Sequence, residues 1–309
     1  MKLSPRIALS LAAGLVLAGC YEVPVTGRKA LNLVNESEMA KISAVGFAEI
    51  KAKTRLSRNE THIALVERIG ERLRGVVPIW DMPDADWEFL VFDAKDVNAF
   101  AMAGGKGGVY EGLFKIIDNE DQLAFVMAHE LAHVTAKHVH ERVSHALAMQ
   151  SVGLLGTAAL MVNGVGALSQ EALMSAYGFG AAAGGLAFDR RMEREADYIG
   201  LMYMAQAGYD PNESIKVLDR LNTLHEAAGM GSGSWLSTHP SHPERIIALL
   251  DAMPKALKTR DEARAQKASP VIIKGTLNNC YFGKRAPARR RKTLCRRVRR
   301  HNARNGKFF

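Results

Sequence analysis

The feature that constrains this chain most is the pentapeptide His-Glu-Leu-Ala-His at residues 129–133. It lies in a mostly apolar stretch, residues 123–147, that predicts one long helix, and residues four apart share a helix face. His129 and His133 can therefore direct two imidazoles at one point, which suits a tetrahedral zinc ion. Glu130 is then a candidate general base for a water at the metal. A plain surface helix is the alternative, but the apolar flanks imply burial, and buried polar side chains need partners.

A zinc ion needs a third protein ligand, and a later segment offers one. The pattern that adds a third histidine is absent, because Val139 occupies its position. Residues 189–207 predict a helix on which Glu193 and Asp197 are four apart and share a face. One carboxylate can bind the metal while the other accepts the ring N–H of a zinc-bound histidine. Glu195 is the second choice of ligand, and a salt-bridged helix surface is the alternative to a metal site.

Other histidines flank this pattern. On a continuous helix His138 and His140 point away from the face shared by the pentapeptide's histidines, so we expect surface or second-layer residues. Residues 237–245 contain two His-Pro pairs ahead of a helix. His239 can stabilise an oxyanion, or bind the metal as a fourth ligand and hold the enzyme off. Arg245 can support transition-state charge. For His239 alone, an ordinary loop histidine is the alternative.

The remaining pattern predicts a mainly α fold with a small antiparallel β-sheet. A strand at 87–92 is followed by two short strands around the glycine-rich turn at 104–108. Residues 151–186 are rich in Gly and Ala, which favours a buried or membrane-touching helical hairpin over a membrane span. The helices predicted besides the central one lie at 35–53, 61–76, 189–207, 211–226 and 243–253.

The N-terminus has the pattern of a secretory signal. A positively charged start precedes an apolar run at residues 7–18, which is too short for a comfortable membrane span. Leu-Ala-Gly-Cys at residues 17–20 resembles a bacterial lipobox, in which the cysteine, here Cys20, is lipidated. Tyr21 follows where an aspartate would indicate retention in the inner membrane. An ordinary signal peptide with an incidental cysteine is the alternative.

The net charge of +9 belongs to one end of the chain. Twelve Lys and Arg and no acidic residue lie between residues 284 and 307, which leaves 29 basic against 32 acidic residues elsewhere. The body is therefore mildly acidic, and the basic segment is a terminal tail for which nucleic acid is the least suitable partner. Cys280 and Cys295 can pair in an oxidising compartment.

Together these residues resemble one family of zinc metallopeptidases, that of the CaaX prenyl proteases and the HtpX heat-shock protease. The likeness is strongest to its periplasmic lipoprotein branch, BepA-like but without a helical-repeat domain. It covers about residues 20–255. The matching motifs are His129-Glu130-x-x-His133, Glu193-x-x-x-Asp197, Thr238-His239-Pro240 with Glu244-Arg245, the Thr26-Gly27-Arg28 leader and Asn98-Ala99-Phe100-Ala101 with Gly104-Gly105.

The resemblance implies a gluzincin-type α+β domain that binds one zinc ion per chain, with Glu193 as the third ligand and His239 close to the metal. It also implies that the hairpin at 98–110 supplies an edge strand on which an extended substrate pairs through its backbone. The predicted site is thus metal ligands His129, His133 and Glu193; catalytic Glu130, His239 and Arg245; Asp197 behind a ligand; and substrate-binding Asn98, Ala99, Phe100 and Ala101.

The function implied is a zinc-dependent endopeptidase that cleaves misfolded or unassembled envelope proteins, lipid-anchored at the periplasmic face of the outer membrane. Its partners would be unfolded proteins and, through the anchor, the membrane. The alternative is a periplasmic chaperone or assembly factor that uses the same cleft without turnover, although a pure binder needs no Glu130. The predicted division is a signal peptide (1–19), a tether (20–34), a metallopeptidase domain (35–265) and a disordered basic tail (266–309).

Overall fold

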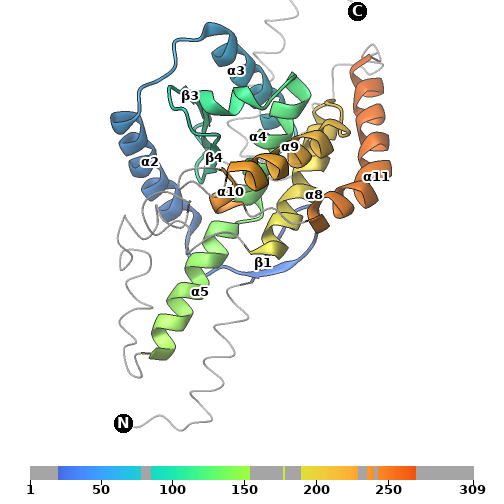
Figure 1. Ribbon diagram of the computed structural model, residues 1–309. Helices are drawn as coiled ribbons and strands as arrows, with labels where there is room; N and C mark the ends of the chain where they lie inside the picture. Colours follow the sequence, from blue (N-terminus) through green and yellow to red (C-terminus); the bar gives the residue numbers. More distant parts are fainter. Residues whose placement is uncertain are drawn as a thin grey trace, which may run out of the picture. The chain divides into compact units, whose positions relative to one another are not determined.

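The computed structural model describes residues 20–77, 85–153, 177, 189–228, 235–239 and 243–268 (Figure 1). The signal peptide, most of residues 151–186 and the tail with Cys280 and Cys295 lie outside these ranges, and what the sequence predicts for them stays a prediction. The division into tether, domain and tail also stays a prediction. Within the described ranges, no helix combines the length and apolar composition needed to cross a membrane.

The described chain is mainly helical with small sheets, which confirms the predicted fold class. Four helices begin after an Asn or Asp whose side chain accepts a backbone N–H of the first turn, namely Asn35, Asn59, Asn119 and Asp189. The helices are α2 (Glu36–Lys53), α3 (Glu60–Arg74), α4 (Glu120–Thr135), α5 (His138–Gly153), α8 (Arg190–Gln206), α9 (Glu213–Ala228), α10 (Trp235–Thr238) and α11 (Pro243–Ala268), with a 3-10 helix η2 (Glu111–Lys115).

The main sheet is mixed, where the sequence predicted an antiparallel one. Its strands are β3 (Glu88–Phe92), β4 (Ala99–Met102) and β5 (Lys106–Tyr110), in the order β3-β5-β4. β4 and β5 form the expected hairpin, and Gly104 and Gly105 turn it at positive φ. β5 also pairs with β3, in parallel, along the edge of β5 opposite to β4. β4 is thereby left at the edge of the sheet.

Helix α4 lies at the centre of the fold, and its residues from 122 to 135 are all buried. β4 packs against it, and α3, α8 and α9 also contact it (Figure 1). α8 lies close against α4 at Gly200, where an added Cβ would lie 2.9 Å from both the backbone N and Cα of His129. This contact sets the distance between the two helices that carry the predicted metal ligands.

The predicted single helix over 123–147 is wrong, because the chain breaks between α4 and α5. Lys137 adopts φ 55°, in the left-handed region that ends helices. Glycine is the usual residue there, so a lysine gave the sequence no stop signal. Its Nζ lies 3.1 Å from Glu36 and 4.2 Å from the centre of the Tyr21 ring, contacts that offset a backbone cost of about 1–2 kcal/mol.

Other helix boundaries also differ from the prediction, among them those of α9 and α11. α9 begins at Glu213, because Pro211 and the next residue form a turn ahead of it. α11 continues past the expected end at Met253 and through Pro254. Ala256, one turn further, is fully buried, so tertiary packing outweighs the low helix propensity of proline.

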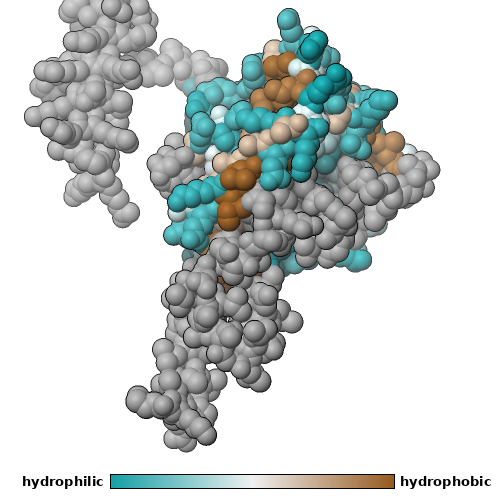
Figure 2. All heavy atoms as spheres, turned by 90° about the vertical axis from the view of Figure 1, so that its left-hand side faces the viewer, coloured by the Kyte–Doolittle hydropathy of each residue, from teal (hydrophilic) through white to brown (hydrophobic). Residues whose placement is uncertain are grey.

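The side of the fold that carries α2 presents a mixed surface (Figure 2). Hydrophilic residues cover most of the coloured area, and apolar residues reach it in bands between them. Val45 of α2 is 53% exposed, one of several large apolar side chains at the described surface. Scattered exposure of this kind is normal for a protein surface and indicates no ligand by itself.

We predict that Gly200→Ala forces α8 away from α4. Because the new methyl would meet backbone atoms, which cannot rotate aside, unfolding free energy should fall by about 1–3 kcal/mol. Denaturant unfolding measures this loss. Gly75→Ala is the matched control, since its Cβ would meet nothing nearer than Arg72 O at 3.4 Å and its φ is −69°. Equal stability of the two variants would contradict the prediction.

Candidate active site

Four buried side chains from three separate parts of the chain meet at one point. His129 and His133 come from α4, Glu193 from the first turn of α8, and His239 directly follows α10. One nitrogen or oxygen from each lies within 4.8 Å of all the others. The structure thus brings together the three predicted ligands, and it adds His239 to them.

Four contacts between these atoms have the length expected for ligands of one ion. His133 Nε2 lies 3.1 Å from His129 Nε2 and 3.3 Å from Glu193 Oε1. His239 Nδ1 lies 3.3 Å from His129 Nε2 and 3.0 Å from Glu193 Oε1. Ligands of a tetrahedral zinc, with metal–ligand bonds of about 2.0–2.1 Å, stand about 3.3 Å apart. The donor set and these four distances are therefore consistent with one zinc ion in the cluster.

The charges in the cluster are balanced by neighbouring groups. Burial lowers the pKa of His133 well below its ordinary value, which keeps it in the neutral form that binds a metal. Burial acts on His129 in the same direction, but hydrogen bonds to Asp197 and Glu193 outweigh it and raise its pKa to about 9. Burial also opposes ionisation of Glu193, yet nearby His239 and Arg245 hold its pKa well below the usual range.

Asp197 and Arg245 lie behind the ligands. Asp197 Oδ1 is 3.0 Å from His129 Nδ1, as predicted for a carboxylate that orients a zinc-bound histidine. Arg245 donates from Nε and Nη2 to the two oxygens of Asp197, both at 2.7 Å, and its Nη1 is 2.8 Å from Glu193 Oε2. The guanidinium thus holds the carboxylates, whereas the sequence suggested support of transition-state charge.

Glu130 borders the cluster and is contacted by a residue that the sequence analysis did not single out. Trp235 Nε1 donates to Glu130 Oε1 at 2.6 Å, and the Trp235 ring stacks on His239 with centroids 4.6 Å apart. The backbone N–H of Trp235 donates to Val97 O, which ties α10 to the start of β4. A lone tryptophan between a Gly- and Ser-rich stretch and a His-Pro pair was the signal available.

A cavity connects the predicted edge strand with the metal cluster. Its lining includes residues of the hairpin and of the helix that carries Glu130 and His133. β4 therefore lies beside these two residues. The hairpin residues that line it are Asn98, Ala99, Phe100 and Ala101, the same four that the sequence predicts for substrate binding.

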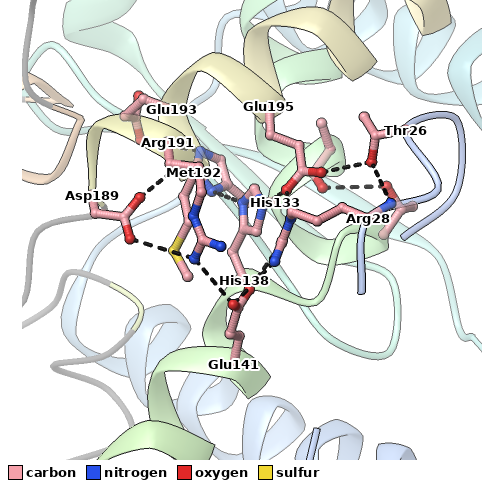
Figure 3. Close-up of polar contacts among 12 residues, drawn as sticks. Thr26, Arg28, His133, His138, Glu141, Asp189, Arg191, Met192, Glu193 and Glu195 are labelled. Atoms are coloured by element: carbon pink, nitrogen blue, oxygen red, sulfur yellow. Dashed lines mark hydrogen bonds and ion pairs between the residues drawn. The ribbon is translucent and has the colours of Figure 1, made fainter. Parts of the chain in front are cut away.

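A second buried polar cluster lies behind His133 (Figure 3). His138 is fully buried and its Nδ1 is 2.9 Å from His133 Nδ1, so the expectation that it faces away is wrong and that of a second-layer residue is confirmed. The break at Lys137 turns it back toward α4. Glu195 lies here, apart from the metal cluster; burial would raise its pKa, but hydrogen bonds from His138, Thr26 and Arg28 lower it to about 2.

His140, the other histidine beyond the pentapeptide, is also buried. Its Nε2 lies 3.3 Å from Glu36 Oε2, at the start of α2. It joins α5 to the first residue of α2 and does not approach the metal cluster among the described contacts.

Comparison with known proteins identifies relatives of this chain. The family model "Peptidase family M48" matches residues 64–253. "Mitochondrial metalloendopeptidase OMA1" of Schizosaccharomyces pombe is 31% identical over 239 residues, 77% of this chain and 68% of that protein. The Arabidopsis thaliana protein of the same name is 35% identical over 181 residues, 58% of this chain and 34% of that protein.

A bacterial protein is similar as well. "Beta-barrel assembly-enhancing protease" of Escherichia coli is 29% identical over 195 residues, which cover 62% of this chain and 37% of that protein. The chain therefore spans about a third of the length of this relative and of the Arabidopsis one. The substrates and partners of the whole proteins are thus proposals for this chain.

Proposed function

Because the chain belongs to peptidase family M48 and is a metalloendopeptidase, we propose that it cleaves unfolded or unassembled proteins at the buried cluster of His129, His133 and Glu193. The observation that carries the proposal is that β4, an edge strand, lies beside Glu130 and the metal cluster, with a narrow cavity of about 20 Å³ between them. Backbone pairing, a base and a metal site are then within reach of one bound peptide.

Edge pairing favours unfolded substrates. β4 pairs with β5 on one side, and among the described strands none covers its other edge. An extended peptide added there would hydrogen-bond through its backbone, which demands no particular sequence. A folded protein offers few free extended segments, so this edge favours chains that have not folded.

Peptide hydrolysis needs a base that takes a proton from the attacking water and a Lewis acid that polarises the scissile carbonyl. Zinc, when bound, supplies a Lewis acid that polarises the scissile carbonyl. Glu130 takes a proton from the attacking water at a carboxylate oxygen and returns it to the leaving nitrogen, so the carboxylate is regenerated. Asp197 and Arg245 keep the ligand carboxylate and His129 oriented throughout.

The described conformation is a closed state of this site. His239 Nδ1 lies among the ligand atoms as a fourth donor, and Trp235 hydrogen-bonds the proposed base Glu130. Both side chains belong to the segment 235–239, so one movement of α10 would free the fourth position and the base together. Of the two roles that the sequence left open for His239, this geometry supports the fourth ligand that holds the enzyme off.

We expect Glu130→Gln to lower the rate of casein cleavage by about 10²–10⁴, because the amide cannot accept the proton of the attacking water. Zinc content should stay at one per chain, since Glu130 is not in the ligand set. Cleavage is followed by gel electrophoresis, with and without a chelator and after zinc is returned. Glu244→Gln, at an exposed position on α11, is the matched control. Undiminished cleavage by Glu130→Gln would refute the proposal and leave the chaperone alternative.

For the closed state, we predict that His239→Ala raises casein cleavage about tenfold, because removal of a latch worth about 1.4 kcal/mol changes the open population by that factor. Trp235→Phe keeps the ring but loses the hydrogen bond to Glu130, and should raise the rate less. His145→Ala, an exposed histidine of α5, serves as the control. A slower His239→Ala enzyme would instead assign His239 to oxyanion stabilisation.

The place of action follows from separate features. We propose a lipid anchor at Cys20 and a location at the periplasmic face of the outer membrane, supported by Leu-Ala-Gly-Cys at residues 17–20. The name of the Escherichia coli relative supports envelope substrates, whereas the other relatives are named as mitochondrial. Radiolabelled palmitate fed to expressing bacteria should label the wild type and not Cys20→Ala. An unlabelled wild type would contradict the anchor.

A further inference from the structure

The N-terminal hairpin, residues 20–31, folds against the helices that carry the metal site. Its strands β1 (Cys20–Glu22) and β2 (Lys29–Leu31) pair antiparallel, and Val23 and Ala30 are buried. The Tyr21 hydroxyl donates to the backbone oxygen of Thr135 at the end of α4, 2.9 Å away. The hairpin lies outside the residues that the family model matches, which begin at 64.

Arg28 makes the principal contacts of this hairpin. Its two terminal nitrogens donate to the two oxygens of Glu141 on α5, at 3.0 and 2.8 Å. Its Nε donates to Glu195 Oε2 on α8 at 2.7 Å, and Thr26 Oγ1 donates to the other Glu195 oxygen at 2.6 Å. Charge-assisted bonds of this length are the strong ones, and together they fix the Glu195 carboxylate.

From Glu195 the contacts lead to a metal ligand (Figure 3). His138 Nε2 lies 3.0 Å from Glu195 Oε2, and His138 Nδ1 lies 2.9 Å from His133 Nδ1. Both imidazoles are buried, so neither bond can be exchanged for water without rearrangement. A continuous path of hydrogen bonds therefore joins Arg28 to His133.

The direction of each bond follows from what His133 must do. A zinc ligand offers an unprotonated nitrogen, and His133 Nε2 is the atom in the cluster. The proton of the neutral ring is then on Nδ1, which donates to His138 Nδ1. His138 must carry its own proton on Nε2 and donate it to Glu195. This arrangement requires an acceptor at Glu195, which the donors Arg28 and Thr26 hold in place.

We propose that the N-terminal hairpin is a working part of the zinc site, in which Arg28, Glu195 and His138 are positioning residues that set the tautomer and orientation of His133. His129 differs, because its acceptor Asp197 comes from α8, which also carries Glu193. The hairpin therefore acts on one ligand of the set. This inference rests on the zinc site of the proposed enzyme but not on its substrate.

The test measures zinc affinity of the full-length chain in detergent, by competition with a chromophoric chelator. Arg28→Ala should weaken zinc binding about 10–100-fold, the usual effect of losing a partner behind a histidine ligand. Arg191→Ala is the matched control: Arg191 also pairs with Glu141, at 3.1 Å, but has no described contact with Glu195. It should bind zinc within about threefold of the wild type.

A second pair of variants tests whether His138 orients His133 through its hydrogen bonds or only fills space in the core. His138→Leu removes both hydrogen bonds and should weaken zinc about as much as Arg28→Ala. His138→Gln keeps one acceptor and one donor in the same place and should restore most of the affinity. The unfolding midpoint of the chelator-treated proteins is recorded alongside, because a purely structural role would lower that midpoint and leave the affinity of the folded fraction unchanged.

The outcomes are distinct. Equal zinc affinity of Arg28→Ala and Arg191→Ala, or His138→Gln no better than His138→Leu, would overturn the inference. A wild type that binds no zinc would instead overturn the proposed function. Should Arg28→Ala fail to fold, Thr26→Val decides: this nearly isosteric change at an exposed position loses only the hydroxyl bond to Glu195, and should weaken zinc about threefold. Unchanged affinity in that variant would count against the hairpin's role.

Discussion

The structure depends on the compensation of two carboxylates buried in its centre. Glu193 and Asp197 are almost without exposure, and an uncompensated charge there would cost several kcal/mol. Arg245 pairs with both, and His129 contacts both. Removing one partner from such a buried set typically costs about 3–5 kcal/mol, because the others remain buried and unpaired. A metal ion held by the four clustered side chains would complete this compensation.

The compensation requires that α4 and α8 pack closely against each other. Gly200 permits this approach, since its missing side chain leaves room for the backbone of His129. Glu193 is two helical turns away on α8, so the same contact that packs the core also sets the position of a ligand relative to the two histidines. Core packing and metal geometry are therefore one property of this pair of helices.

Two peripheral segments close the site from different parts of the chain. The segment 235–239 adds His239 to the ligand atoms and Trp235 to Glu130, and it would restrict access of water and substrate. The N-terminal hairpin reaches His133 from behind, through Glu195 and His138. On our proposals the first segment has to move for turnover, whereas the second has to stay. The site would thus combine a segment that moves, 235–239, with an N-terminal hairpin that stays fixed behind His133.

The sequence by itself determined what depends on local spacing. His129 and His133 share a helix face, and Glu193 and Asp197 do so on α8, because four residues span about one helical turn. The hairpin at Gly104 and the mainly helical class followed from equally local rules. Only the tertiary structure decided the parallel pairing of β3 with β5, the break at Lys137 and the partners of Arg28 and Trp235. These contacts join residues distant in the chain, or offset backbone strain through such residues, and no local pattern encodes them.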